Sequence, residues 1–351
     1  MQTLNSIEEV RAWRGDGNVG FVPTMGALHD GHASLIRASA ADNKRTVVSI
    51  FVNPTQFGLN EDLDKYPRTL DADFKLCEAA GADAVFTPDK AMIYPPGFCT
   101  WVEVEGLGDR LCGASRPGHF RGVTTVVSKL FNIVRPTRAY FGQKDAQQAL
   151  ILKRMTADLN LPIELVICPI IREPDGLAMS SRNRYLSEDE RKRAVGLSKA
   201  LGEVQKLFES GTRTAGVLHG QLVTVLDDYA DKTDYAEVVS AETLEPVLEV
   251  NGPTLVAAAA FFGSTRLIDN VILGLRAWRK LHPNPQTPYP ARSANVRIIF
   301  SSPRRNHVDL RMHLHPKGPP WTTLPRLSSN SLTATCSPLT LLTLRTPCVR
   351  A

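Results

Sequence analysis

The sequence of 351 residues has no uninterrupted apolar run of the length that a membrane-spanning helix needs, which is about 20 residues. We therefore expect no integral membrane protein. The segment 1–18 lacks a basic stretch followed by an apolar core and carries Glu8 and Glu9, so it is not expected to be a secretory signal. These absences predict a cytoplasmic protein that does not work at a membrane.

Cysteine residues are few, and none of them forms a C-x-x-C pair. Disulfide scaffolds and zinc sites need closely spaced pairs, so the spacing argues against both and fits a reducing compartment. The six cysteines are Cys77, Cys99, Cys112, Cys168, Cys336 and Cys348.

Acidic residues almost disappear from the last 78 residues. Segment 274–351 holds 12 Lys and Arg residues against Asp309 alone, a balance of +11, together with 11 of the 24 prolines. Segment 1–273 has 29 basic and 35 acidic residues, a balance of −6, so the net charge of +5 is due to the tail. We expect the tail to be disordered, because it has no periodicity that could bury surface. A basic arm for RNA or an acidic surface, and sequence from a mistaken gene model, are the alternatives; for the body we expect no nucleic-acid partner.

Segment 1–178 alternates short β-branched runs with helical stretches. Such alternation predicts an open α/β domain with a parallel sheet, in which ligands bind beyond the carboxyl ends of the strands. The expected strands cover 20–22, 46–52, 84–86, 101–104, 139–141 and 164–171, and the expected helices cover 69–80, 123–134 and 145–157.

Segment 179–273 has a different texture and predicts a small α+β domain. Ser187 and Glu190 have the spacing of a capping box, which opens a long helix to about Glu209. A second helix is expected over 213–230, and strands over 235–241, 255–262 and 266–272.

The loop after the first expected strand, PTMGALHDGHASLI (23–36), is the clearest candidate site. His29 and His32 are three residues apart at the first turn of a helix, which places both imidazoles beside free N–H groups and the positive end of the dipole. A nucleotide phosphate binds naturally there, and Gly26 and Gly31 would let the backbone approach it. The alternative is a surface turn that glycines merely shape.

Two further loops offer groups for an anionic organic substrate. In FVNPTQFG (51–58), Asn53 and Gln56 could orient hydroxyls or a carboxylate, although an Asn-Pro turn is as good a reading. In SRPGHFRGV (115–123), Arg116, His119 and Arg121 are three potential cations, and a solvated basic loop is the alternative.

Two more loops offer charge and hydroxyl groups for phosphates. In FGQKDAQQ (141–148), Lys144 could serve as a point charge, Asp145 could cap the next helix and Gln148 lies one turn further. MSSRNRYLS (179–187) offers two hydroxyls and Arg182. Viewed alone, each loop could equally be an ordinary cap or linker; their joint position at strand ends favours a site.

Together these segments resemble the pantothenate synthetase (pantoate–β-alanine ligase) family over residues 1–273. H-x-G-H alone would indicate only the wider nucleotidyltransferase superfamily. The resemblance rests on the full set VPTMGALHDGH, SIFVNPTQFG, YPRTLDAD, ASRPGHFRGV, FGQKDAQQ, DGLAMSSRNRYLS and RLIDN. It implies a Rossmann-like nucleotide- and pantoate-binding domain (1–178), a lid-like α+β domain (179–273) that supports homodimers, and a tail (274–351) outside the family pattern.

The resemblance also implies an AMP-forming amide ligase of pantothenate and coenzyme A biosynthesis. The pantoate carboxylate would attack the α-phosphorus of ATP to give pantoyl adenylate and pyrophosphate, and the β-alanine amine would then displace AMP. Mg²⁺ accompanies ATP in the family, and the resemblance names no ligands for it. An in-line displacement at phosphorus needs positioning and positive charge more than covalent help.

Site residues are carried over by match to the family's motifs. The catalytic set is His32, as a proton donor, with His29 and Lys144. The ATP set is Met25, Gly26, Ala27, Leu28, His29, Asp30, Gly31, His32, Gly142, Gln143, Lys144, Asp145, Ile171, Met179, Ser180, Ser181 and Arg182. The pantoate set is Gln56 and Gln148 with Asn53, Arg116 and His119, and Gln56 is also expected near β-alanine.

Two other functions remain open on the sequence. A nucleotide-binding body could have been kept for scaffolding without catalysis, or a sibling nucleotidyltransferase could activate another carboxylic acid. Response to pantoate separates both from the ligase.

Overall fold

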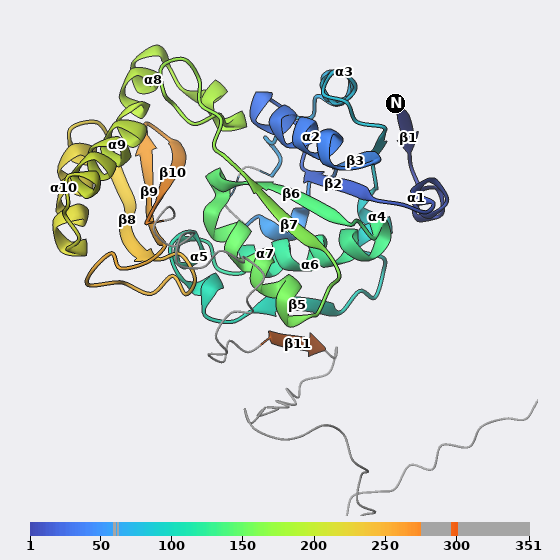
Figure 1. Ribbon diagram of the computed structural model, residues 1–351. Coiled ribbons are helices and arrows are strands. Elements are labelled where there is room, and N and C mark those ends of the chain that lie inside the picture. Colours follow the sequence, from blue (N-terminus) through green and yellow to red (C-terminus); the bar gives the residue numbers. More distant parts are fainter. Residues whose placement is uncertain (59–60, 62, 275–295, 301–351) are drawn as a thin grey trace, which may run out of the picture. The chain divides into compact units, whose positions relative to one another are not determined.

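A six-stranded parallel sheet organises the first part of the protein (Figure 1). The computed structural model describes residues 1–58, 61 and 63–274 and the backbone of 296–300. The strand order is β1-β4-β3-β2-β6-β7, with β1 Gln2–Leu4, β2 Val19–Thr24, β3 Arg45–Ile50, β4 Ala84–Phe86, β6 Arg138–Gly142 and β7 Glu164–Cys168. The predicted α/β class is confirmed.

Helices cover both faces of this sheet. Because successive strand residues point to opposite sides, neighbouring residues pack under different helix layers. Phe21 and Val47 belong to the cluster under α1 (Ile7–Arg14), α6 (His119–Val134) and α7 (Ala146–Asp158). Their neighbours Val22 and Val48 belong to the cluster under α2 (Asp30–Asp42) and α3 (Leu70–Ala79). Figure 1 shows the two helix layers with the sheet between them.

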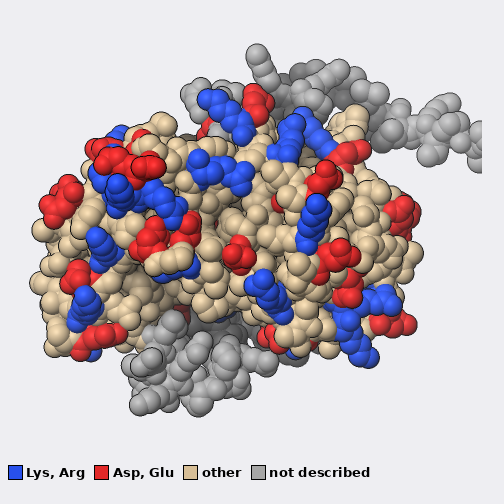
Figure 2. Space-filling model, turned by 90° about the horizontal axis from the view of Figure 1, so that it is seen from above, with Lys and Arg blue, Asp and Glu red and all other residues tan. Residues whose placement is uncertain are grey.

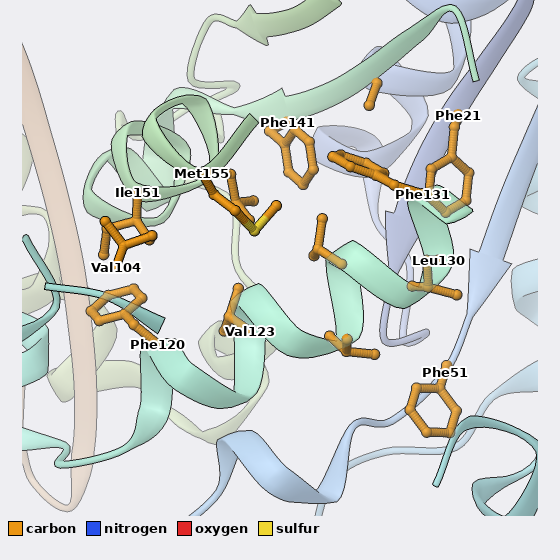
Figure 3. Packing of buried hydrophobic residues seen from close by; sticks show 14 of the residues in the cluster. Phe21, Phe51, Val104, Phe120, Val123, Leu130, Phe131, Phe141, Ile151 and Met155 are labelled. Carbon is orange, nitrogen blue, oxygen red and sulfur yellow. The ribbon is translucent and has the colours of Figure 1, made fainter. Parts of the chain in front are cut away.

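Helix α6 provides much of the larger core cluster (Figure 3). Its apolar positions recur at three and four residues, as the sequence predicted, and they are buried. Phe131 lies edge-on to both Phe21 and Phe141, with ring centroids 6.4 Å apart in each pair. Truncating Phe131 to alanine would cost roughly 3–5 kcal/mol of unfolding free energy. Phe131 thus joins α6 to strands β2 and β6 within this cluster.

Strand β5 (Thr100–Val104) lies outside the parallel sheet, and its inclusion there was wrong. It pairs antiparallel with the backbone of β11 (Val296–Phe300). Its own backbone bonds to α6: Val102 N donates to Thr125 Oγ1 at 3.0 Å, and Thr124 Oγ1 donates to Val102 O at 2.5 Å. Strand β7 is also shorter than predicted and ends at Cys168, because Pro169 has no N–H for a sheet ladder.

The second part is a three-stranded antiparallel sheet with helices, as predicted. Its strands are β8 Lys232–Ser240, β9 Thr254–Phe262 and β10 Thr265–Leu273, and its helices are α8 Glu188–Ala194, α9 Gly196–Glu209 and α10 Ala215–Asp227. The single helix expected over 187–209 is divided at Val195, where Gly196 packs against Tyr229 so closely that a Cβ would lie 2.3 Å from it. The capping box of Ser187 and Glu190 is present.

Three short helices, α4 Lys90–Ile93, α5 Cys112–Ser115 and the 3₁₀ turn Leu107–Asp109, connect these elements. Within the described residues no helix is both long and apolar enough to cross a membrane. The domain limits 178/179 and 273/274 stay predictions. The expectation of a disordered tail concerns residues that, apart from Gly274 and the backbone of 296–300, lie outside the described part of the chain.

Charges of both signs alternate over the molecular face in Figure 2. Lys and Arg side chains there stand among Asp and Glu side chains, without a field of one sign. This face therefore presents no extended basic surface.

Candidate active site

Three of the candidate loops lie together at the carboxyl ends of the parallel strands. Strands β3, β2 and β6 are neighbours and parallel, so the segments that follow Ile50, Thr24 and Gly142 meet at the same end. A side-chain contact joins the first two loops: Gln56 Nε2 lies 3.0 Å from Met25 Sδ. The electrostatic effect of Lys144 on His29, described below, joins the third.

His29 and His32 form the cap of helix α2. Their rings lie 4.1 Å apart, centroid to centroid. The Nδ1 atom of His29 accepts the N–H of Gly31 at 3.2 Å, and the Nδ1 atom of His32 accepts the N–H of His29 at 3.3 Å. The first N–H groups of a helix have no acceptor within the helix. Here the two imidazoles accept hydrogen bonds from backbone N–H groups at the helix start, as in a capping box.

These hydrogen bonds fix the tautomer of both rings. A ring nitrogen that accepts a bond carries no hydrogen, so the neutral imidazoles hold theirs on Nε2, which remains a donor. Burial of the rings, followed by the nearby Lys144 charge, lowers the pKa of His29 to about 4. Burial, followed by His29 and Lys144, lowers the pKa of His32 to about 3. At neutral pH the pair therefore presents two uncharged N–H donors.

A glycine makes room for the first ring. A Cβ on Gly31 would lie 2.8 Å from Cε1 of His29 and 2.9 Å from its Nδ1, so any side chain here would displace the imidazole. Gly31 was predicted to let the backbone approach a phosphate; in the structure its missing side chain leaves space for the His29 ring. The same position faces Met179, whose Cβ would be 3.7 Å away, so segment 179–182 reaches this loop.

A buried carboxylate holds the turn before the histidines. Asp73 of α3 is 2% exposed and accepts the N–H groups of Ala27 at 3.0 Å and Leu28 at 2.8 Å. Gly26 has φ +82°, a conformation that favours glycine. Asp73 lies in the YPRTLDAD segment, but no local pattern assigned it to this turn.

Segment 143–145 forms a 3₁₀ turn that leads into α7. Lys144 is half-buried, and its positive charge is the second cause of the lowered pKa of His29. Asp145 occupies the N-cap position of α7 but makes no side-chain cap bond, so the predicted capping role was wrong. It is exposed, and its negative charge opposes the lowering of the His29 pKa. Gln148, one turn on, is half-buried.

Arg184, which the sequence analysis did not single out, also acts on His29, whose pKa its charge helps to lower. Arg182, the predicted residue, lies two positions earlier in the 3₁₀ helix Ser181–Tyr185, which Ser180 caps by accepting the Arg182 N–H at 3.2 Å. Met179 N donates to the carbonyl of Ile171 at 3.0 Å, so these two predicted ATP residues are brought together.

Asn53 holds the side-chain amide of Gln56 in place by a hydrogen bond. It is 1% exposed, and its Nδ2 donates to Gln56 Oε1 and to the Gly122 carbonyl, both at 3.1 Å. Its Oδ1 accepts the hydroxyl of Tyr94 at 2.8 Å. Every polar atom of this amide thus has a protein partner. Tyr94 is a residue that no sequence signal indicated.

Of the three potential cations, His119 is uncharged, so its part of the prediction was wrong, and Arg116 and Arg121 both have partners within the protein. Arg116 forms an ion pair with Glu61, and the hydrogen bonds of Arg116 keep the pKa of that carboxyl below its usual range against the opposing effect of burial. Burial, followed by Arg116, lowers the pKa of His119 to about 4, so its ring is neutral. Arg121 lies over Trp101, 4.5 Å from the ring centroid.

These residues shape a small cavity beside Gln56. Its volume is about 170 Å³, and Trp101, His119 and Arg121 are among the residues that line it. His119 Nδ1 lies 2.8 Å from the Gln56 carbonyl and Arg116 donates to the same oxygen at 3.3 Å, so both fix the Gln56 backbone. A polar cavity of this size admits a small organic acid next to the Gln56 amide.

A protein-made metal cage does not occur in the part of the chain that the structure describes, since no three His, Cys, Asp or Glu residues cluster there. The same part holds four free cysteines, Cys77, Cys99, Cys112 and Cys168.

Known proteins share this arrangement of loops and strands. The profile of the pantoate-beta-alanine ligase family matches residues 1–272. The chain is 55% identical over 276 residues to a pantothenate synthetase of Acetivibrio thermocellus, which covers 78% of this chain and 98% of the relative. A relative from Acidobacterium capsulatum with the same name is 57% identical over 261 residues, 74% of this chain and 87% of the relative.

Solved structures agree with the sequence relatives. A crystal structure of pantothenate synthetase from Thermus thermophilus superposes with a TM-score of 0.75 at 44% identity, over 78% of this chain and 100% of that one. A Francisella tularensis pantoate-beta-alanine ligase, described as complexed with beta-gamma ATP and beta-alanine, gives a TM-score of 0.64 at 33% identity, over 78% and 97%. The predicted resemblance and its Rossmann-like fold are confirmed.

Proposed function

We infer the roles of the individual site residues from one premise: the chain belongs to the pantoate-beta-alanine ligase family. It joins pantoate to β-alanine at the expense of ATP and releases AMP and pyrophosphate. The pantoate carboxylate attacks the α-phosphorus and pyrophosphate leaves; the β-alanine amine then attacks the acyl carbon of pantoyl adenylate and AMP leaves.

The two histidines bind the phosphates as neutral donors. The observation that carries this role is the use of both Nδ1 atoms as acceptors for backbone N–H groups, which leaves both Nε2–H groups for a ligand. A triphosphate beside the rings would raise their pKa, because a nearby negative charge favours the imidazolium form. In the free enzyme His32 is neutral and has no acidic proton to give. Once the bound triphosphate has raised its pKa, the ring takes up a proton from solvent and gives that proton to the departing pyrophosphate.

Lys144 supplies the permanent positive charge at this edge of the sheet. Charge builds up on the pyrophosphate as it leaves, and a fixed ammonium group stabilises it without reorganisation. Segments 25–32 and 142–145, with Ile171 and residues 179–182, enclose the nucleotide. Arg184 adds charge near His29.

Pantoate lies between the Gln56 and Gln148 amides, with the cavity beside Gln56 open to β-alanine. Asn53, Arg116 and His119 act on this pocket chiefly through Gln56, whose amide and carbonyl they bind. An enclosed pocket protects the adenylate from hydrolysis.

Magnesium binds together with ATP, as the Mg·ATP complex, and not at a separate site made by the protein. Among the described residues no three His, Cys, Asp or Glu side chains are grouped so that they could hold a metal ion. Mg²⁺ often keeps its waters and binds substrate phosphates, so it needs no such group. The cytoplasmic location and the homodimer remain proposals. Light scattering of the purified protein tests the second, and a mass near 38.5 kDa would contradict it.

Isotope transfer tests the reaction. Pantoate labelled with ¹⁸O in its carboxylate is incubated with Mg·ATP and then with β-alanine. Attack at the α-phosphorus predicts one ¹⁸O atom in AMP and unlabelled pyrophosphate. Release of ADP, or pyrophosphate release that ignores pantoate, would contradict the ligase and favour another activity or another acid.

A further inference from the structure

A pair of residues from the second part of the protein reaches the phosphate loop. Asp269 and Asn270 lie in β10 and are 2% and 4% exposed. Asn270 Nδ2 donates to the carbonyls of Gln143 and Lys144, both at 3.0 Å, and its Oδ1 accepts Gln143 Nε2 at 3.3 Å. A side-chain amide has two N–H donors, and here each meets one carbonyl of the 143–145 turn.

Because peptide groups are planar, these two hydrogen bonds also set the direction of the N–H groups on the opposite side of the turn. In a trans peptide the carbonyl of one residue and the N–H of the next point in opposite directions. Fixing the carbonyls of Gln143 and Lys144 towards Asn270 therefore directs the N–H groups of Lys144 and Asp145 away from it. At the start of a helix such N–H groups have no intrahelical acceptor and can bind phosphate.

Asp269 fixes a second segment that is predicted to bind the nucleotide, and it does so through Arg172. Its carboxylate binds Arg172 through both oxygens, at 2.6 and 3.1 Å, and also accepts the Asn270 N–H at 2.8 Å. Arg172 in turn donates to the Gly176 carbonyl at 3.1 Å and follows Ile171 directly. The pair thus connects the 143–145 turn with the 171–179 segment.

We propose that Asn270 is a positioning residue for ATP activation: from β10 it holds the 143–145 turn so that Lys144 and the adjoining N–H groups face the triphosphate, while Asp269 holds the 171–179 segment. This inference rests on the proposed role of the 143–145 turn in phosphate binding. It predicts that the second part of the protein is needed for the first step through the position of this turn, although Asp269 and Asn270 do not themselves contact the reacting atoms.

Separate measurement of the two chemical steps tests this role. Pantoate-dependent pyrophosphate release from Mg·ATP reports the first step. The second step is followed by adding β-alanine to enzyme in which adenylate has already formed. Asn270→Asp keeps the size of the side chain but aims a carboxylate at two carbonyl oxygens. We expect the first step to slow by about 10- to 100-fold, as for a displaced catalytic group, with the second step and the KM for pantoate within about twofold of wild type.

A second contact between the same two parts of the protein provides the matched control. Asp234 of β8 binds Arg266 at 2.7 Å and Ser115 of the first part at 2.9 Å, away from the phosphate loop. Asp234→Asn should alter thermal stability about as much as Asn270→Asp without separating the two steps. Asn270→Ala, which removes the donors without adding charge, serves if the Asp variant does not fold.

The outcomes separate the two proposals. If Lys144→Ala slows the first step and the Asn270 variants do not, the positioning role is wrong while the proposed function stands. Equal loss in both steps, or the same pattern in Asp234→Asn, would also overturn it by showing a general packing effect. If Lys144→Ala has no effect, the role of the turn itself fails.

Discussion

At the scale of single residues, the chemistry of this site depends on which nitrogen of each histidine is free. A cap made of serine or aspartate would satisfy the helix start equally well. Histidine does so with Nδ1 and keeps Nε2–H for a ligand, so His29 and His32 combine a structural and a binding function. The spacing of H-x-G-H could predict their closeness, but not the tautomer, which follows from the hydrogen bonds.

The lowered histidine pKa values predict acid-sensitive stability. His29, His32 and His119 have an ordinary pKa of 6.5 when unfolded and about 4, 3 and 4 when folded. Below pH 6.5 the unfolded chain binds more protons, so the free energy of unfolding falls as the pH drops from 6.5 towards 4. Each histidine contributes at most about 1.4 kcal/mol per pH unit.

Urea unfolding between about pH 7.5 and about pH 4.8 measures this effect. His119→Gln should flatten the fall relative to wild type, because glutamine has no proton to take up. A free energy of unfolding that stays level or rises as the pH falls through this window would contradict the assignment of neutral, buried imidazoles.

At the scale of elements, the helix α2 start works because a glycine leaves space for a ring. Gly31 is the second residue of α2, and Gly216 is the second residue of α10. A Cβ on Gly216 meets nothing within 4 Å, whereas one on Gly31 meets the His29 ring. The two positions are alike in the helix and differ only in their surroundings.

This difference predicts opposite results for two identical substitutions. Gly216→Ala should leave the rate of pyrophosphate release unchanged and raise stability by up to about 1 kcal/mol, the helix preference of alanine. Gly31→Ala should slow that release by about tenfold or more by displacing His29. Equal rates in both variants would show that the ring position is not needed.

Elements that depend on local pattern could be predicted from the sequence, and those that depend on distant partners could not. The run at 84–86 and the helix near 70–79 were correct because β-branched residues and apolar spacing define them locally. Strand β5 was misplaced because Thr124 and Thr125, distant in the sequence, bind its backbone. The division at Val195 lies beside the close approach of Gly196 to Tyr229, a distant partner that no local pattern indicates.

The same distinction holds for the site. Loops that directly follow strands, with His29, Gln56 and Lys144, could be found from sequence because a parallel sheet brings such loops together. Asp73 and Asn270 reach the site from a neighbouring helix and from the second part of the protein, and only the fold brings them there.

At the scale of the whole molecule, the match to the ligase family ends close to the point where the basic tail begins. The family match ends at residue 272, β10 ends at Leu273, and the solved Thermus thermophilus structure is covered in full by 78% of this chain. Among the side chains that the structure describes, the core clusters draw on residues no later than Leu273, and the tail adds the backbone of β11, which pairs with β5.

Removal of residues 275–351, which include β11, is expected to leave the kcat for pantothenate formation unchanged and to lower the Tm by no more than a few degrees, because α6 still binds the β5 backbone. Assay of the shortened and full chains in parallel measures this. A loss of activity in the shortened chain would show that the tail takes part in folding or catalysis. Salt-sensitive RNA binding by the full chain alone would support the basic-arm alternative.

The most direct test of the whole account is the pantoate-dependent burst of pyrophosphate in three proteins: wild type, His32→Ala and His219→Ala. His219 is an exposed histidine of α10, outside the site, and serves as the control. We predict an equal burst in wild type and His219→Ala, and a burst slower by about 100-fold or more in His32→Ala with an unchanged circular dichroism spectrum. A wild-type burst in folded His32→Ala would contradict the claim that the capped imidazole pair activates ATP.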